Sequence, residues 1–180
     1  MCGINGIWNL NGSLVKKDKI TSMNQNLKHR GPDDNNILIE KNLALGHTRL
    51  SIIDIDNGQQ PISNADGSIS MVYNGEVYNY LELRKDLLQK GHQFHTNCDT
   101  EVVLKCYEEF GFNFVRQLRG MFAIAIWDRK NNCIFLARDR LGQKPIYYYH
   151  YNNKFAFSSE LNSLLIGIDH NKEIDPNGLR

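Results

Sequence analysis

The sequence predicts an α+β fold built from largely antiparallel sheets, and three observations support this. Strand signals and helix signals each occur in groups rather than in strict alternation, which is typical of α+β proteins. Two strong helical stretches follow one another, at 79–91 and 100–111. The segment 121–127, MFAIAIW, is apolar on both faces, so we expect two stacked sheets between helical layers.

The chain begins with the signals of a strand and a helix. Apolar residues close to alternation predict a strand over 3–10, and apolar residues at helical spacing behind Asp18 predict a helix. Pro32 disfavours helical geometry in the residue before it, so 29–34, HRGPDD, is expected to be a loop.

The next signals are those of β structure. The segments 37–40 and 43–49 flank two residues like the strands of a hairpin. A further strand is expected over 69–74, ending in the pair Asn74–Gly75, which is typical of a turn.

Two helices are expected after that pair. Asn79 is a candidate cap, Glu82 stands where a capping box needs it, and Gly91 ends the pattern. The second helix covers 100–110 and is expected to end at Gly111.

The remainder is predicted to consist of strands joined by turns, closed by a short helix at 161–165. The four strand segments are 121–127, 133–138, 145–151 and 154–159.

Length and charge limit the function classes. With 180 residues, 41% of them hydrophobic, the chain can bury the core of one domain, and no linker or repeat divides it. The 21 Lys and Arg nearly cancel the 20 Asp and Glu and are scattered, which argues against nucleic acid as a partner.

The sequence also argues against a membrane or secreted protein. The longest apolar run, 121–127, has about a third of the ~20 residues that span a bilayer. The four cysteines show no CxxC spacing, and no signal-peptide pattern is present. We therefore expect a cytoplasmic protein.

Cys2 directly follows the initiator methionine. Methionine is readily removed before a small residue, and its removal would leave a thiol and a free α-amino group on one residue. An α-amine with a pKa of about 7.7–8 can act as a base near neutral pH, and a thiol with a pKa of about 8.5 is readily activated. Cys2 is thus a candidate nucleophile with its own base, although a lone terminal cysteine more often has no chemical role.

Four residues are candidates for a metal site: His92, His95, Cys98 and Cys106. Structural zinc takes four well-spaced ligands, and this set lacks a second pair, so we expect no metal here.

Seven motifs follow one another along almost the whole chain: MCGI at 1–4, HRGPD at 29–33, HTRLSIID at 47–54, NGEVYN at 74–79, CDTE at 98–101, GMFAIAIWD at 120–128 and RDRLGQKPIYYY at 138–149. In this order they resemble the class II glutamine amidotransferase domain of asparagine synthetases. Departures from the usual family pattern at Asn5, Gln143 and Asn162 affect none of the roles below.

The resemblance implies the N-terminal nucleophile fold, a four-layer αββα sandwich with two mainly antiparallel sheets. It also implies that Cys2 attacks the side-chain amide of glutamine, forming a thioester and releasing ammonia before water frees glutamate. Asn74 and Gly75 would bind the substrate and form the oxyanion hole. From the residues alone, an ordinary Asn-Gly turn is favoured there.

Further residues are implied to bind glutamine. Arg49 would bind its α-carboxylate, and Glu76 with Asp99 its α-ammonium group. Surface charge, or a helix cap at Asp99, is the alternative from the residues alone. The segment after Arg49 would line the site, through Leu50, Ser51, Ile52 and Ile53.

Two other motif segments receive no catalytic role. The family places HRGPD near the glutamine pocket, yet stiffening of the loop by Pro32 explains it equally well. His47 lies in an expected strand, where a packed or solvent-facing imidazole is favoured.

Family members continue into a synthetase domain with a Ser-Gly-Gly-x-Asp-Ser loop, which this sequence lacks. We therefore expect residues 1–180 to be the glutaminase domain of a longer protein, with glutamine as substrate and a C-terminal synthetase domain as partner. No cofactor is expected for this domain, and ATP and magnesium would belong to the synthetase domain. The oligomeric state, a homodimer included, stays open.

Three alternatives to an asparagine-forming enzyme remain. The ammonia could serve another acceptor, or the domain could bind glutamine without hydrolysing it. It could also hydrolyse other amides, although Arg49, Glu76 and Asp99 would then lack the charges they match.

Overall fold

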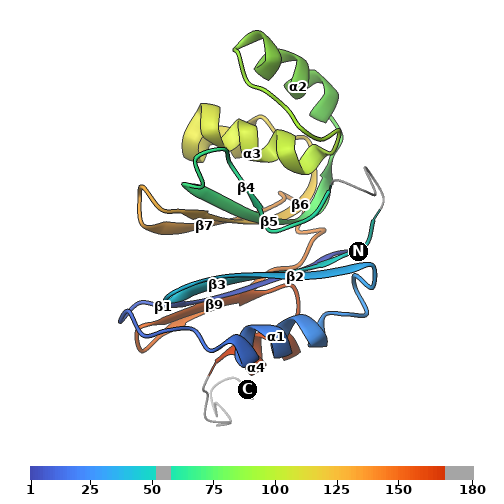
Figure 1. Cartoon of the computed structure of the whole chain (residues 1–180). Coiled ribbons are helices and arrows are strands. Elements are labelled where there is room, and N and C mark those ends of the chain that lie inside the picture. Colours follow the sequence, from blue (N-terminus) through green and yellow to red (C-terminus); the bar gives the residue numbers. More distant parts are fainter. Residues whose placement is uncertain (52–57, 169–180) are drawn as a thin grey trace, which may run out of the picture.

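The computed structural model describes residues 1–51 and 58–168, which form four layers (Figure 1). Two antiparallel sheets are stacked face to face, and helices cover the outer face of each (Figure 1). The predicted αββα sandwich is confirmed. No helix in this part of the chain has both the length and the apolar character needed to cross a membrane.

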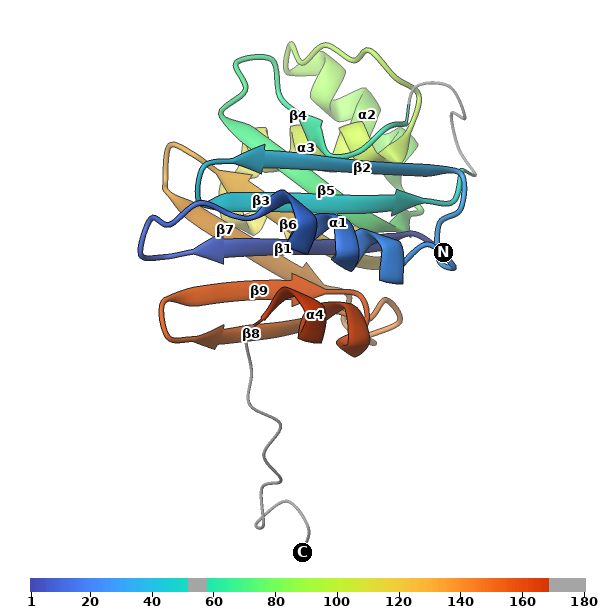
Figure 2. The same cartoon turned by 60° about the horizontal axis from the view of Figure 1, so that its bottom comes forward.

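The first sheet brings both ends of the described chain together. Its strands are β1 (Gly3–Asn9), β2 (Asp34–Glu40), β3 (Leu43–Arg49), β8 (Tyr147–Tyr151) and β9 (Lys154–Ser158), in the order β2-β3-β1-β9-β8 (Figure 2). Gly3 pairs with Thr48. This register places Cys2 beside the end of β3, where Arg49 and Leu50 lie.

The second sheet has the order β4-β5-β6-β7. Its strands are β4 (Ile62–Ser63), β5 (Ile69–Val77), β6 (Gly120–Asp128) and β7 (Cys133–Arg138). The two-residue strand β4 was not expected, because so short a segment carries no detectable alternation.

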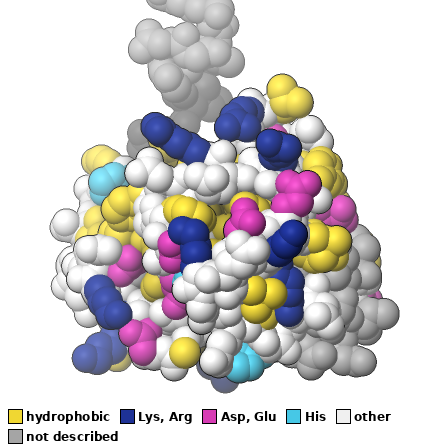
Figure 3. Space-filling model, turned by 90° about the horizontal axis from the view of Figure 1, so that it is seen from above, with side chains coloured by type: hydrophobic (Ala, Val, Ile, Leu, Met, Phe, Trp, Pro, Cys, Tyr) yellow, Lys and Arg dark blue, Asp and Glu magenta, His cyan; other side chains and the backbone are white. Residues whose placement is uncertain are grey.

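Helices complete the outer layers. On the first sheet lie α1 (Lys17–Asn26) and α4 (Leu161–Gly167), while α3 (Asp99–Phe110) covers the second sheet and packs against α2 (Tyr80–Gln89) (Figure 1). A short 3₁₀ helix, Gly111–Arg116, follows α3. Where Figure 3 looks onto the α2 and α3 side, basic and acidic side chains are interspersed, as the balanced composition indicates.

Strand β6 separates two hydrophobic cores. Phe122, Ile124 and Ile126 point into the core under α2 and α3, whereas the alternate residues Ala123 and Ala125 belong to the core between the sheets. Because successive side chains of a strand point to opposite faces, the doubly apolar pattern of 121–127 required both cores. The prediction of stacked sheets is confirmed.

The expected Asn-Gly turn is wrong. Strand β5 runs through Asn74 and Gly75 to Val77, paired with β6 throughout. A Cβ atom at Gly75 would lie 2.2 Å from the carbonyl oxygen of Met121, so close approach to β6 requires glycine there.

The capping box expected at Asn79 is also wrong. Asn79 occupies the cap position of α2, but its side chain forms no capping hydrogen bond. Instead, Nδ2 donates to the Gln117 carbonyl at 2.9 Å, and Oδ1 accepts from the Arg119 backbone N–H at 2.9 Å. Tertiary contacts therefore replace the local cap.

Candidate active site

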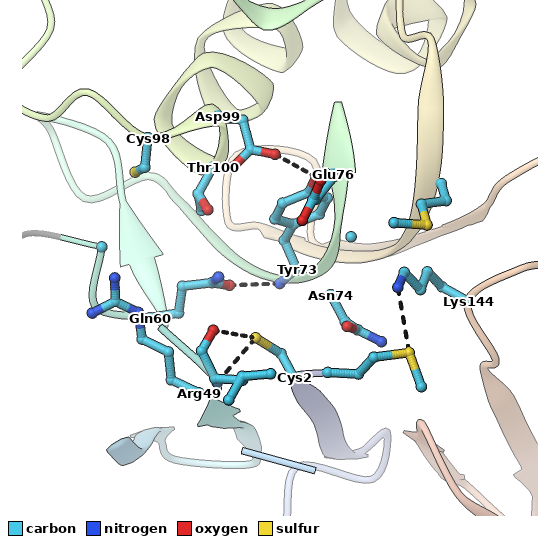
Figure 4. A pocket seen from close by; sticks show the side chains of 15 residues that line it. Cys2, Arg49, Gln60, Tyr73, Asn74, Glu76, Cys98, Asp99, Thr100 and Lys144 are labelled. Carbon is cyan, nitrogen blue, oxygen red and sulfur yellow. Dashed lines mark hydrogen bonds between the residues drawn. The ribbon is translucent and has the colours of Figure 1, made fainter. Parts of the chain in front are cut away.

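A cavity of about 240 Å³ opens where the amino terminus, the end of β3, strand β5 and the start of α3 converge (Figure 4). It is lined by Met1, Cys2, Arg49, Leu50, Gly58, Gln60, Tyr73, Asn74, Gly75, Glu76, Cys98, Asp99, Thr100, Met121 and Lys144.

The cavity brings together most of the residues expected from the sequence: Cys2, Arg49, Leu50, Asn74, Gly75, Glu76 and Asp99. Ser51 does not line it, and its backbone N–H donates to Asp33 at 2.8 Å. Ile52 and Ile53 lie outside the described residues.

The Cys2 thiol is packed against the end of β3. The backbone N–H of Leu50 donates to Sγ at 3.4 Å, and the thiol lies 3.7 Å from the Leu50 carbonyl oxygen. Burial raises the pKa of the Cys2 thiol, although the Leu50 N–H and the charges of the amino terminus, Arg49 and Lys144 act to lower it. The thiol therefore needs a base to become an efficient nucleophile.

The loop 29–34 positions Cys2, a role that the sequence did not reveal. Arg30 is buried, and its Nε donates to the Cys2 carbonyl at 3.0 Å. Its guanidinium also binds Glu160 at 3.0 Å. A Cβ at Gly31 would lie 2.3 Å from the Thr48 carbonyl carbon, so the loop packs directly on β3.

Asn74 presents an unused donor to the cavity (Figure 4). Its side chain is only 2% exposed, and Nδ2 has no hydrogen-bond partner among the described residues. A buried unpaired donor costs about 1–3 kcal/mol in folding free energy. Such a donor is suited to an acceptor atom that enters the cavity.

Asp99 is held rigidly at the start of α3. Its Oδ2 accepts from the Tyr73 hydroxyl at 2.7 Å and from the Val77 backbone N–H at 3.0 Å. Burial raises the pKa of Asp99, and these two hydrogen bonds oppose that shift. Cys98, not Asp99, occupies the N-cap position, so the alternative of a helix cap at Asp99 is wrong.

The charges of the cavity have a separated arrangement. Arg49 lines it beside Cys2, while Glu76 and Asp99 line the opposite side (Figure 4). One cation and two anions set apart in this way complement the carboxylate and ammonium groups of a free α-amino acid.

Several lining residues were missed from the sequence. Gln60 accepts from the Tyr73 backbone N–H at 2.6 Å through Oε1, and Thr100 and Lys144 also line the cavity. They are distant from Cys2 along the chain and carry no local pattern that indicates a site. Lys144 lies in the motif RDRLGQKPIYYY, but the motif alone gives it no role.

His47 is a packed imidazole, one of the two expected environments. It is 1% exposed and lies outside the cavity lining. Burial lowers the pKa of His47 to about 3, so the ring is neutral at physiological pH.

Two of the four candidate metal ligands have other side-chain contacts. His92 Nε2 lies 3.0 Å from Glu109, and Cys98 Sγ lies 3.1 Å from the Thr96 hydroxyl. In 1–51 and 58–168, no group of three or more potential ligand side chains is arranged to hold a metal ion.

Comparison with known families gives a match over the full chain. The model of the glutamine amidotransferase domain family matches residues 1–180. An asparagine synthetase (glutamine-hydrolyzing) of Bacillus subtilis is 42% identical over 99% of this chain and 30% of its own length. The asparagine synthetase of Brassica oleracea is 38% identical, also over 99% of this chain and 30% of its length. The chain thus spans about a third of the curated relatives it matches.

Solved structures share the fold. The glutamine phosphoribosylpyrophosphate amidotransferase of Bacillus subtilis, solved with ADP and GMP, superposes with a TM-score of 0.77. The match covers 92% of this chain and 44% of that chain at 22% identity. At this identity the similarity concerns the four-layer fold.

Proposed function

The chain belongs to the glutamine amidotransferase domain family, an enzyme family, and from this premise we propose that it hydrolyses glutamine with Cys2 as nucleophile. One observation carries the proposal. The Cys2 thiol and the unpaired Nδ2 of Asn74 line one cavity, which also contains charges complementary to a free amino acid. Candidates for the nucleophile, for the oxyanion donor and for the charges that bind the substrate thus share one site.

Substrate binding follows from the charges. The α-carboxylate of glutamine would pair with Arg49, and its α-ammonium group with Glu76 and Asp99. The side-chain amide would then lie between Cys2 and Asn74. An amide without an α-carboxylate and an α-ammonium group would not use Arg49, Glu76 or Asp99, which disfavours the broader amide-hydrolase alternative.

Catalysis would begin once Met1 is removed. The free α-amino group of Cys2 takes the thiol proton as Sγ attacks the amide carbon, so that a carbon–sulfur bond forms. Asn74 Nδ2 and the Gly75 N–H would stabilise the developing oxyanion. The α-ammonium group of Cys2 then gives its proton to the leaving nitrogen of the substrate amide as the carbon–nitrogen bond breaks. This step yields ammonia and a thioester between Cys2 and the glutamyl group. Water then hydrolyses the thioester to glutamate and restores the thiol.

The ammonia would feed a synthetase domain that forms asparagine from aspartate with ATP and magnesium. The relatives named asparagine synthetase support this acceptor, and their greater length provides for the second domain. ATP and magnesium would belong to that second domain. A related synthetase with another ammonia acceptor is the alternative.

The test is a glutaminase assay on chain shown by intact mass to begin at Cys2. We expect glutamate formation in wild type and none in Cys2→Ala. Cys133→Ala is the matched control, because Cys133 is also a partly exposed free cysteine but lies outside the cavity lining. Equal rates in wild type and Cys2→Ala would refute the proposal. Glutamine binding without turnover in both would instead support a non-catalytic module.

A further inference from the structure

Lys144 places a buried cation at the amino terminus. Its side chain is 7% exposed, and its Nζ lies 3.4 Å from the Sδ atom of Met1 (Figure 4). Among the described residues, no carboxylate pairs with this ammonium group. Lysine is rarely buried without a partner, so its place in the cavity calls for a functional explanation.

The loop before β8 is built to hold Lys144 in place. The buried Asp139 carboxylate accepts the backbone N–H groups of Lys144 at 3.0 Å and Gln143 at 2.9 Å, and it also binds Phe122 of β6 at 3.2 Å. Arg138 Nε donates to the Lys144 carbonyl at 2.9 Å. The backbone of Lys144 is therefore fixed to the second sheet, and its side chain reaches Met1, which precedes β1 of the first sheet.

Removal of Met1 changes what this cation faces. The Met1 thioether, its present neighbour, would be lost, and the nitrogen bonded to Met1 would become the free α-amino group of Cys2. A nearby cation disfavours the protonated form of an amine and favours a thiolate. Both effects assist a residue that must act as base and nucleophile.

We propose that Lys144 is a positioning residue for proton transfer at Cys2, a fixed cation that keeps the α-amino group of the processed terminus neutral and basic. This inference rests on the proposed function, because Cys2 needs a neutral amine only if it is the nucleophile.

Other charged groups around Cys2 do not replace Lys144. Arg30 binds the Cys2 carbonyl but is paired with Glu160. Arg49 would be paired with the α-carboxylate of bound glutamine, while Glu76 and Asp99 would be paired with its ammonium group. Tyr73 donates its hydroxyl to Asp99. In the substrate complex, neither these charged side chains nor the charged groups of glutamine would neutralise the charge of Lys144.

The experiment measures kcat and kcat/KM of the processed chain between about pH 5.5 and 9 for wild type, Lys144→Met and Lys144→Arg. Loss of the cation raises the pKa of the amine, so in Lys144→Met the acidic limb of both profiles should move up by about one pH unit. Below that limb the rate should fall about tenfold, with little change at high pH. Lys144→Arg should restore the wild-type limb.

Lys130→Met is the matched control, because Lys130 is an exposed lysine paired with Asp66 at 2.8 Å and lies outside the cavity lining. It should leave the profile unchanged. An unshifted limb in Lys144→Met, or an equal loss of rate at every pH, would overturn the inference, since a merely structural role predicts the latter.

Alkylation of Cys2 by iodoacetamide, followed by peptide mass mapping over the same pH range, gives a readout that needs no turnover. The midpoint, the pH at which alkylation reaches half its maximal rate, should also rise in Lys144→Met, because the cation that is lost favours the thiolate. If the chain hydrolyses no glutamine but the midpoint shifts, the proposed function fails and the electrostatic role of Lys144 stands. If the chain is active and neither limb nor midpoint shifts, only the Lys144 inference fails.

Discussion

The hydroxyl of Tyr73 donates a hydrogen bond of 2.7 Å to Oδ2 of Asp99, inside the cavity that contains Cys2. Tyr73 comes from β5 and Asp99 from the start of α3. The bond holds Oδ2 of the Asp99 carboxylate in place. The orientation of the expected ammonium-binding carboxylate thus depends on a tyrosine that need not touch the substrate.

Tyr73→Phe should weaken glutamine binding more than turnover. A hydrogen bond to a charged group contributes about 1.5–3 kcal/mol, so we expect KM to rise about 10-fold with kcat within about twofold. Because the hydroxyl stabilises the carboxylate, its loss raises the pKa of Asp99 further, and the increase in KM should grow as the pH falls.

Steady-state kinetics at several pH values test this prediction, with Tyr107→Phe as control. Tyr107 donates a comparable bond, 2.8 Å, to Asp128 outside the cavity lining. The control should lose stability and keep its KM. A fall in kcat alone for Tyr73→Phe would contradict the positioning role.

Asn74→Ala should separate activity from stability. If Nδ2 binds the oxyanion, kcat should fall by about 10²–10³, with KM changed little. Because Nδ2 has no partner to lose among the described residues and its burial is itself a cost, the thermal midpoint should stay the same or rise.

Asn64→Ala should behave in the opposite way, since its side chain accepts from the Ile69 N–H at 2.9 Å and donates to Glu108 at 3.1 Å, outside the cavity. It should lose stability and retain activity. Paired kinetic and thermal measurements on both variants check the contrast, and a large rise in KM for Asn74→Ala would argue for a ground-state binding role instead.

Retention of Met1 should abolish most of the glutaminase activity but leave glutamine binding intact. An acylated nitrogen is not basic, so chain produced with methionine removal inhibited should lose at least about 10²-fold in kcat. Arg49, Glu76 and Asp99 keep their places in the structure that contains Met1, so calorimetry should still detect glutamine binding. Full turnover by protein of the Met1-containing mass would show that another group is the base.

Asp139→Asn should destabilise the fold in a pH-dependent way. Burial raises the pKa of Asp139, but several backbone N–H donors outweigh burial and hold it below its ordinary value. The stabilisation is therefore fully present above the unfolded-state pKa of about 3.9 and is lost as the pH falls through the lower folded-state pKa.

Urea unfolding at neutral and acidic pH measures the effect. We expect Asp139→Asn to lose about 2 kcal/mol at pH 7 and the difference from wild type to shrink below about pH 4. Asp66→Asn is the control, since the pKa of Asp66 is also lowered, first by Lys130, but its side chain is exposed. Its unfolding midpoint should hardly change. If Asp139→Asn lowered the free energy of unfolding equally at every pH, altered packing and not the carboxylate charge would explain the loss.

The sequence correctly predicted those parts of the fold that depend on the apolar pattern and on the conformational preferences of neighbouring residues. The apolar faces of 121–127 required a core on each side, and Gly91 and Gly111 end their helices with positive φ angles. Where local and tertiary preferences compete, the local prediction was wrong. Asn74–Gly75 continues a strand because β6 pairs with it, and Asn79 binds the chain around Gln117 instead of its own helix.

The site was predicted unevenly for the same reason. Residues in recognisable motifs, such as Cys2, Arg49 and Asp99, were expected to lie together, and they do. Tyr73, Gln60 and Lys144 act through neighbours that are distant in sequence, so their contribution follows only from the folded geometry.

The two stacked sheets give the interior a part in the chemistry. Cys2 extends from the first sheet and Asn74 belongs to the second, while Trp8 and Trp127 meet between the sheets with ring centroids 5.3 Å apart. The distance between the proposed nucleophile, Cys2, and the proposed oxyanion donor, Asn74, therefore depends on the thickness of the packing between the two sheets. A methyl group added to or removed from that filling would alter reaction geometry without touching any residue of the cavity.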